Sequence, residues 1–347
     1  MINCRTATSA RSFFTCVLLR GGLAFVTFLA LSTAAANSQT QPEKSAPGLP
    51  VHVTHVLGFE NVPRNARGDL LIEGDGLRFQ RNGSSTAQIS IGSIRSIFVG
   101  GGDRQVGGMP VTLGKAAVPF GGGRVVSLFS HKKYDSVALE YRDANGGEHA
   151  AIFRFSEREG EIFKMGLVAR GAQSMARSED PGFVRNTRED SQHSQKWSVQ
   201  VDRVDPGATA IDPCFSSAIY ENLLRELSKS KQFKEVLRSG DRSASDSSGV
   251  LLLKTNVEHY SPGSETRRAV TTVTGATKIK VHIELVTSDG HVVLERTVEG
   301  NVRFIGDNLK ATNKVASKTA KLLQRATLPA RASLIQQATA KEAETTI

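Results

Sequence analysis

The sequence predicts an α+β protein with two folded units, each built on an antiparallel β-sheet. Two observations lead to this prediction. Short stretches in which apolar and polar residues alternate follow one another through both halves of the chain, separated by turn-forming residues. Both halves also hold segments in which apolar residues recur every three or four positions, as in amphipathic helices. The length of 347 residues suits about two domains of ordinary size.

The first predicted unit, residues 51–172, is an antiparallel sandwich or partly open barrel closed by a C-terminal helix. VHVTHVLGF alternates, and Asn82-Gly83 is a tight hairpin turn between LRFQR and AQISI. SVALEYRD and EHAAIFRFS are two further strands around a turn at residues 145–147. In the former, Val137, Leu139 and Tyr141 are expected on one face. The FSHKKY segment before it is interpreted as the exit of a loop.

The closing helix is predicted within SEREGEIFKMGLVARG. Ser156 is the expected N-cap, acidic residues fill the first turns, and Gly171 is expected to end the helix. Its apolar, core-facing side is expected to consist of Ile162, Met165 and Leu167/Val168.

The phrase LFSHKKYDSVALEYRDANGGEHAAIFRF, with the order of strands and the closing helix, resembles the pleckstrin-homology-like (PH-like) domains of uncharacterised bacterial exported proteins. The resemblance covers about residues 70–170 and is a pattern of elements. Function varies widely within that superfold, so the resemblance implies a binding or scaffold module and no particular chemistry.

The second predicted unit, residues 196–328, is an α+β domain with an antiparallel sheet and two helices. The strand KWSVQVDRV leads to a helix with Asp212 as N-cap and Pro213 in its first turn, running to about Ser228. Its buried side is expected to carry Phe215, Ile219, Leu223 and Leu227.

Four strands are predicted next, in FKEVLR, GVLLLKTNVEHY, ATKIKVHIELVTS and HVVLERTVEGNVRF, with Asp289-Gly290 as a tight turn. Asn308 is then expected to cap a final helix that reaches about Ala326. The order β-α-β-β-β-β-α, with GSETRRAVTTVTGATKIKVHIELV in its middle, is similar to an uncharacterised family of Gram-negative envelope proteins and lipoproteins. This resemblance covers nearly the whole unit. The chain departs from the lipoprotein members because it lacks the cysteine that is acylated in them.

The N-terminal segment, residues 1–36, is expected to be a cleaved signal peptide. Three arginines precede the apolar run GGLAFVTFLAL and the small-residue site Ala34-Ala35-Ala36. An apolar run of eleven residues is short against the roughly 20 that a bilayer span needs. We therefore expect cleavage after Ala36 and export to the periplasm or the extracellular space. An uncleaved N-terminal membrane anchor is the alternative.

Polar, proline-containing stretches predict linkers at residues 37–50 and 173–195 and a tail at residues 329–347. The formal charge of +10 becomes about +7 when the three leader arginines are removed (10 − 3). Such a chain favours encounters with anionic surfaces. No nucleic-acid partner is expected, because no aromatic residues interleave with the basic ones as stacking requires.

Cysteine and histidine usage argues against several chemistries. Cys4 and Cys16 lie in the leader, so Cys214 can form no intramolecular disulfide and no cysteine-based metal site. We expect Cys214 to be buried, a reactive thiol being the alternative. His52 and His55 are three positions apart on a strand, which puts them on opposite faces and makes a zinc pair improbable.

Phosphate loops and nucleophile motifs are missing as well. The glycine-rich stretch 100–123 fails as a Walker loop, because Met109 replaces its first glycine and Ala116 its Ser/Thr. We interpret this stretch as a loop between two strands. Met109–Phe120 within it is a candidate contact segment for a membrane or a partner. No G-x-S-x-G elbow occurs. We expect no catalytic, cofactor-binding or metal-binding residues, and no cofactor.

Two groups of basic residues are candidate contacts. On the final helix, a spacing of three or four positions places five cations on one face, which is either a solvated surface or a docking face for an anionic lipid surface or an envelope protein. They are Lys310, Lys314, Lys318, Lys321 and Arg325. A second group, His131, Lys132 and Lys133, is a candidate rim of a binding surface.

These patterns together predict an exported, non-enzymatic protein of the bacterial envelope that works as a binding or scaffold module, through contact with a protein or an anionic surface. An envelope hydrolase with an unrecognised site is the alternative. The sequence does not indicate an oligomeric state.

Overall fold

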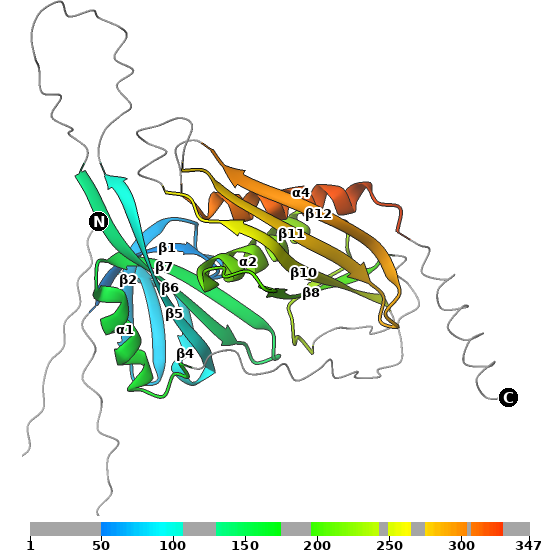
Figure 1. Ribbon diagram of the computed structural model, residues 1–347. Helices are drawn as coiled ribbons and strands as arrows, with labels where there is room; N and C mark the ends of the chain where they lie inside the picture. The colour runs from blue at the N-terminus through cyan, green and yellow to red at the C-terminus, as the bar shows by residue number, and fades with distance from the viewer. Residues whose placement is uncertain are drawn as a thin grey trace, which may run out of the picture. The chain divides into compact units, whose positions relative to one another are not determined.

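The computed structural model describes residues 50–106, 130–174, 196–242, 249–264, 275–303 and 307–328. In this part the chain is a mixed α+β protein with two β-sheets and three α-helices (Figure 1). Several predicted segments lie outside the described residues: the signal peptide, the 329–347 tail and Met109–Phe120. So do both linkers, except for a few residues at their ends.

The first sheet has seven strands in the order β4-β3-β2-β1-β7-β6-β5. All of its neighbouring strands are antiparallel, as the sequence predicts. Its strands are β1 (Val51–Leu57), β2 (Ala66–Glu73), β3 (Gly76–Arg81), β4 (Ser84–Ser90), β5 (Ile94–Val106), β6 (Ser130–Arg142) and β7 (Glu148–Ser156), with a short 3₁₀ turn at Ile91–Ser93. Both Asn82 and Gly83 have positive φ, which confirms the predicted hairpin turn between β3 and β4.

The core of this sheet confirms the predicted face of β6, since Val137, Leu139 and Tyr141 all join one buried cluster with Phe79 and Phe153. The FSHKKY segment was interpreted as a loop exit, which is wrong for the backbone, because β6 begins at Ser130 and pairs with β5 from there on. The partner β5 was not predicted; its glycines, Gly100 to Gly102, obscure the alternation that marks a strand.

Helix α1 (Glu159–Val168) forms where a closing helix was expected, but two details of the prediction are wrong. Its N-cap is Arg158, with φ of 70° and no side-chain cap, instead of Ser156. The side that faces the core carries Phe163 and Leu167. The expected core residues Ile162, Met165 and Val168 are 64%, 62% and 42% exposed.

The second sheet has five strands in the order β12-β11-β10-β8-β9. The strands are β8 (Ser198–Asp205), β9 (Val236–Leu237), β10 (Val250–Ser261), β11 (Thr277–Val286) and β12 (Val292–Val302). The sheet is antiparallel from β10 to β12, but β8 runs parallel to both β9 and β10, so the prediction of a wholly antiparallel sheet is wrong. The reason is that helix α2 carries the chain back over the sheet between β8 and β9. The strand expected in FKEVLR is only the two residues of β9.

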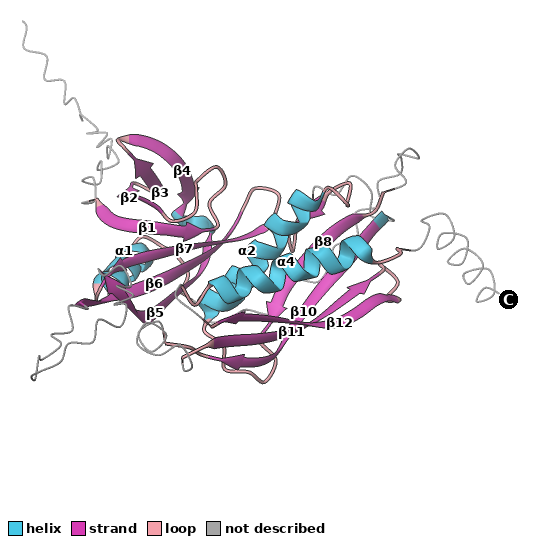
Figure 2. Ribbon diagram, turned by 90° about the horizontal axis from the view of Figure 1, so that it is seen from above, coloured by secondary structure: helices cyan, strands magenta, loops and turns pink. Residues whose placement is uncertain are grey.

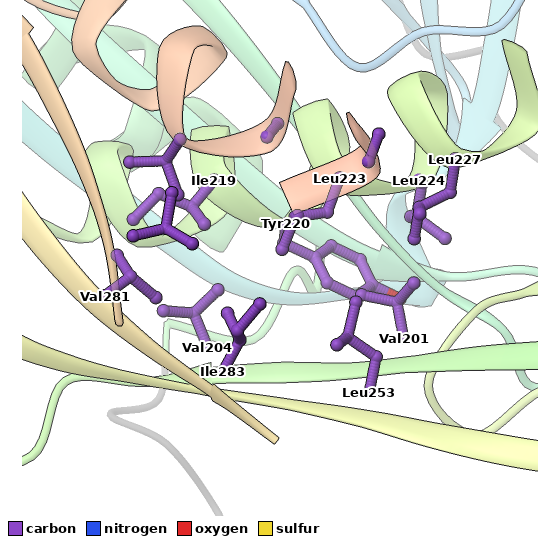
Figure 3. Close-up of a cluster of buried hydrophobic side chains, with 14 of the residues drawn as sticks. Val201, Val204, Ile219, Tyr220, Leu223, Leu224, Leu227, Leu253, Val281 and Ile283 are labelled. Carbon is purple, nitrogen blue, oxygen red and sulfur yellow. The ribbon is translucent and has the colours of Figure 1, made fainter. Parts of the chain in front are cut away.

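Helices α2 (Pro213–Ser230) and α4 (Lys310–Arg325) lie next to each other on one face of this sheet (Figure 2). The Asp212 side chain accepts a hydrogen bond of 2.8 Å from the Cys214 N–H and Pro213 opens the helix, as predicted. The side chains of Ile219, Leu223 and Leu227 point from α2 toward the sheet, where they meet residues such as Val201 and Leu253 (Figure 3).

Helix α4 begins differently from the prediction. Asn308 does not cap it; its side chain instead accepts from Thr277 Oγ1 at 2.8 Å and donates to the Gly263 carbonyl at 3.1 Å. The Asp307 carboxylate accepts from the Leu309 N–H at 2.8 Å just before the helix. Gly300 on β12 lets α4 approach closely, because an added Cβ would lie 2.2 Å from the backbone oxygen of Ala311.

The other side of α2 packs against the first sheet. Cys214 and Ala218 of the helix share a buried cluster with Ala138 on β6 and Ile152 on β7. Helix α2 is therefore covered from both sides, which explains why nearly every residue in its first half is buried. Helix α2 therefore contributes side chains to the core on either side of it.

Candidate functional site

Five cations line the outer side of α4, and we call them the basic face of α4. They are Lys310, Lys314, Lys318, Lys321 and Arg325, the residues that the sequence singles out, and all five are exposed. The helix contains no aspartate or glutamate. Its opposite side is buried in the core through Ala311, Val315, Ala316, Ala320 and Leu323. The charges are therefore displayed by a helix whose orientation is fixed by packing.

Two of these lysines contact the neighbouring strand β12. Lys318 Nζ donates to the backbone carbonyl of Glu299 at 2.7 Å, and Lys314 Nζ donates to Asn301 Oδ1 at 3.5 Å. Neither acceptor is a carboxylate, so the positive charge is not neutralised. Since β12 is an edge strand of the sheet, the Lys318 contact also occupies one of its carbonyl groups, a usual protection against unwanted strand pairing.

The second predicted group lies at the start of β6. Lys133 is exposed and its Nζ lies 3.8 Å from Glu157 Oε1, with both side chains more than half exposed. The side chains of His131 and Lys132 lie outside the described residues, although their backbone belongs to β6. Within the described residues, no ion pair or hydrogen bond joins Lys133 to the basic face of α4. An exposed pair such as Lys133–Glu157 contributes little stability.

An apolar surface that the sequence analysis assigned to the core lies on α1. Ile162, Met165 and Val168 are three of the four large hydrophobic residues that are exposed in the described part of the chain. Their spacing of three places them on one side of the helix. Exposed apolar groups that cluster in this way are typical of contact surfaces.

Between the two sheets lies a network of charged residues that sequence analysis missed. Glu148 on β7 pairs with Arg142 at 2.9 Å and with Arg203 on β8. Glu221 on α2 pairs with Arg238 at 2.7 Å and accepts from the Ala150 N–H on β7 at 2.8 Å. Arg142 and Glu148 face each other across the β6–β7 hairpin, but Arg203 and Ala150 are 55 and 71 positions from their partners, with no spacing rule. The detectable signal is a charged residue within an otherwise buried stretch, such as Glu221 among the apolar residues of α2.

Beside this network is a cavity of about 240 Å³, which we call the junction pocket. It is lined by residues of β5, β6 and β7 on one side and of β8, the following loop and α2 on the other. His149 lines it and is 7% exposed; its Nε2 lies 2.9 Å from Asp143 Oδ2. Burial alone would raise the pKa of the Asp143 carboxyl, but hydrogen bonds from His149, Gly147 and Asn145 hold it below its ordinary value.

His52 and His55 lie on opposite faces of β1, as the odd spacing on a strand predicts. His52 is exposed and pairs with Asp69, whereas His55 is fully buried next to Phe59. The His55 ring bonds to the Pro63 carbonyl at 3.1 Å and to the Phe59 N–H at 3.1 Å. Burial lowers its pKa. His55 is therefore a core residue with both ring nitrogens satisfied.

Another histidine does sit among carboxylates. His282 and Glu284 on β11 and Glu295 on β12 have potential metal-ligand atoms within 4.8 Å of one another. Glu258 on β10 is 3.6 Å from His282 as well. Sequence analysis missed this cluster because the strands that carry it are paired only in the folded sheet. The cluster is partly exposed, and the two ring nitrogens of His282 lie 3.2–3.6 Å from carboxylate oxygens of Glu258, Glu284 and Glu295.

Cys214 is 2% exposed, which confirms the expectation of a buried thiol. Burial, and then the charge of Asp212, raise its pKa well above the ordinary value. A thiol in this state is a poor nucleophile. In the part of the chain that the structure describes, no helix is both long and apolar enough to span a membrane.

No protein-family model matches the chain, and no curated protein matches it either. Among solved structures, a PelC dodecamer from Paraburkholderia phytofirmans is similar to 38% of this chain over 89% of its own, with 16% identity and a TM-score of 0.29. A variant of that dodecamer matches 41% of this chain over 98% of its own, with 19% identity and a TM-score of 0.27. An uncharacterized protein matches 37% over 90%, with 13% identity and a TM-score of 0.23. Similarities this weak carry no argument about this chain.

Proposed function

We propose that this protein is an exported, non-enzymatic component of the bacterial envelope that binds an anionic surface through the basic face of α4. One observation carries the proposal: five exposed cations lie on one side of a helix that contains no acidic residue and whose other side is buried. A solvated helix surface normally mixes both signs of charge. A face of one sign is suited to a partner of the opposite sign.

The expected partner is a membrane with anionic head groups. Each lysine or arginine near such a surface contributes about 1 kcal/mol, so several acting together suffice for reversible binding. The attraction decays over about 10 Å at an ionic strength of 0.1 M, so it must weaken with added salt. Because α4 is already packed on β12 and α2, binding would not require the helix to fold.

The fold of the first unit supports a binding role as well. We propose a PH-like fold for it, and the support is an antiparallel sheet of seven strands followed by helix α1. That assignment implies a binding or scaffold module. The exposed side chains of Ile162, Met165 and Val168 on α1 support a protein contact as a second mode of binding.

An envelope hydrolase remains the alternative, and the Asp143–His149 pair is the observation that favours it. A hydrolase of the serine or cysteine type needs a nucleophile within hydrogen-bond reach of the histidine. Among the described residues, His149 has no hydroxyl or thiol as a hydrogen-bond partner. The carboxylates of the network are held by arginines, which suits a structural role. We therefore favour a binding function over hydrolysis.

Flotation with liposomes tests the proposal. The protein should float with vesicles that contain anionic phospholipid, should not float with purely zwitterionic vesicles, and should dissociate as salt is added. Replacing Lys310, Lys314 and Lys318 by Gln should reduce the floated fraction severalfold. The matched control removes the same charge from the opposite side of the second sheet, by replacing the exposed Lys254, Lys278 and Lys280 with Gln. Equal flotation of the two triple variants would overturn the proposal.

A further inference from the structure

The junction pocket combines one apolar wall with a set of charged groups. Its apolar wall consists of Phe98 on β5, Val204 at the end of β8, and Pro206, Ile211 and Pro213 from the segment that leads into α2. A volume of about 240 Å³ is room for a small organic molecule.

The charged groups of the pocket carry a net positive charge. Arg95, Arg142 and Arg203 contribute three positive charges, and Glu140 and Glu148 contribute two negative ones, so the sum is +1 (3 − 2). Glu148 is shared by Arg142 and Arg203, and Glu140 accepts a hydrogen bond of 3.1 Å from Ser217 Oγ. One guanidinium charge is thus left over for an anion.

Arg95 is the arginine best placed to meet that anion. The pairing of β5 with β6 shifts between Ile94 and Ser96, so Arg95 has no opposite residue on β6, as in a β-bulge. Bulges redirect a side chain and are frequent next to binding sites. Arg95 is exposed and takes no part in the ion pairs of Glu148.

A second observation points to a ligand. His149 lines the pocket and is more than nine-tenths buried, yet its Nδ1 has no hydrogen-bond partner within the described residues. Buried polar atoms without a partner are rare, and an ordered water or a bound ligand commonly supplies the missing hydrogen bond. The ring cannot turn freely, because Nε2 is held by Asp143 and the ring stacks on Tyr141 with centroids 4.9 Å apart.

From these groups we infer that the junction pocket binds a small amphipathic carboxylate, with its carboxylate at Arg95 and its apolar part against Phe98 and Ile211. Arginine is the residue best suited to a carboxylate, because its planar fork can make two parallel hydrogen bonds. Arg95 and Phe98 come from β5 of the first sheet, whereas Ile211 comes from the segment between β8 and α2. A bound carboxylate would therefore bridge the first sheet and the segment that follows β8. This inference does not depend on surface binding by α4.

Isothermal titration calorimetry on the full chain tests the inference, with hexanoate and benzoate as probes. Both should bind saturably and raise the thermal unfolding temperature. Hexanol, which lacks the charge, and inorganic phosphate, which lacks the apolar part, should bind at least about tenfold more weakly, since each omits one of the two contacts.

Variants locate the binding in the pocket. Arg95→Gln should weaken hexanoate about tenfold, the loss expected for one charge-assisted contact. Arg67→Gln, an exposed arginine on β2 of the same sheet, is the matched control and should leave the affinity unchanged. Ser216→Trp should fill the pocket and abolish binding, with far-ultraviolet circular dichroism checking the fold. Hexanol binding as tightly as hexanoate, or equal affinities for the Arg95 and Arg67 variants, would overturn the inference.

Discussion

The hydroxyl of Tyr220 on α2 donates a hydrogen bond of 3.1 Å to the backbone carbonyl of Glu148 on β7, and it accepts one of 2.9 Å from the Ser239 N–H. A single buried hydroxyl thus joins α2, the first sheet and the segment after β9. Tyr220→Phe leaves a buried carbonyl and a buried N–H with one partner fewer. We expect a loss of about 1–3 kcal/mol in the free energy of unfolding, measured by urea denaturation. Tyr260→Phe, a half-buried tyrosine on β10, is the control and should change it by less than about 0.5 kcal/mol.

The ionised carboxylate of Asp143 should stabilise the folded protein at neutral pH but not in acid. Its folded-state pKa lies below the ordinary value, so its ionised form stabilises the fold above the unfolded pKa of about 3.9, and this contribution disappears as the pH falls through the folded pKa. Asn at this position can still accept from the N–H groups of Asn145 and Gly147. It loses the charged acceptor oxygen that faces His149 Nε2.

Asp143→Asn should therefore lower the free energy of unfolding by about 1 kcal/mol at neutral pH. The difference from the wild type should shrink below about pH 4, where the wild-type carboxylate becomes protonated. Urea denaturation at several pH values measures both quantities, with Asp75→Asn in the exposed β2–β3 turn as control. A difference that stays constant down to about pH 3 would contradict this explanation.

Gly300 should be required for the packing of α4 on β12. A Cβ there would lie 2.2 Å from the Ala311 carbonyl oxygen and 2.8 Å from Val315 Cγ2, so the helix would have to move. Gly300→Ala should cost about 1–3 kcal/mol, as overpacked cores do. Gly101→Ala on β5 is the control, because its added Cβ meets nothing within 4 Å. If the two variants unfold at the same urea concentration, α4 is not packed as described.

The free energy of unfolding of two variants can test which side of α1 faces the core. Ile162 is 64% exposed, and Phe163 beside it is 4% exposed. Ile162→Gln should change the free energy of unfolding by no more than about 0.5 kcal/mol. Phe163→Ala should lower it by about 3–5 kcal/mol. A helix with the apolar face that the sequence predicts would give a large loss for Ile162→Gln.

Local signals in the sequence predicted much of this structure correctly. Alternation located most of the strands, though not β5, and it located the buried face of β6. Asp212-Pro213 located the start of α2. The spacing of the cations predicted the basic face of α4, since helical periodicity alone decides which side chains share a side. These features depend on residues a few positions apart.

Features that depend on distant residues were missed. The parallel pairing of β8 with β10 and the pairing of Glu148 with Arg203 join segments that only the complete fold brings together. The orientation of α1 was wrong for the same reason. Both of its sides carry apolar residues, and the sheet that covers Phe163 decides which side is buried. No local pattern distinguishes a core face from an exposed contact face.

The central claim is that the basic face of α4 touches an anionic surface, and a site-specific fluorescent label tests it most directly. In the chain without residues 1–36, whose one native cysteine is the buried Cys214, an environment-sensitive dye is attached at an introduced cysteine. The positions are Gln324→Cys, exposed between Lys321 and Arg325, or Thr297→Cys on β12. On addition of vesicles with anionic phospholipid, we expect the dye at position 324 to shift its emission to shorter wavelength and the dye at position 297 to stay unchanged. No shift at 324, or equal shifts at both positions, would contradict the claim.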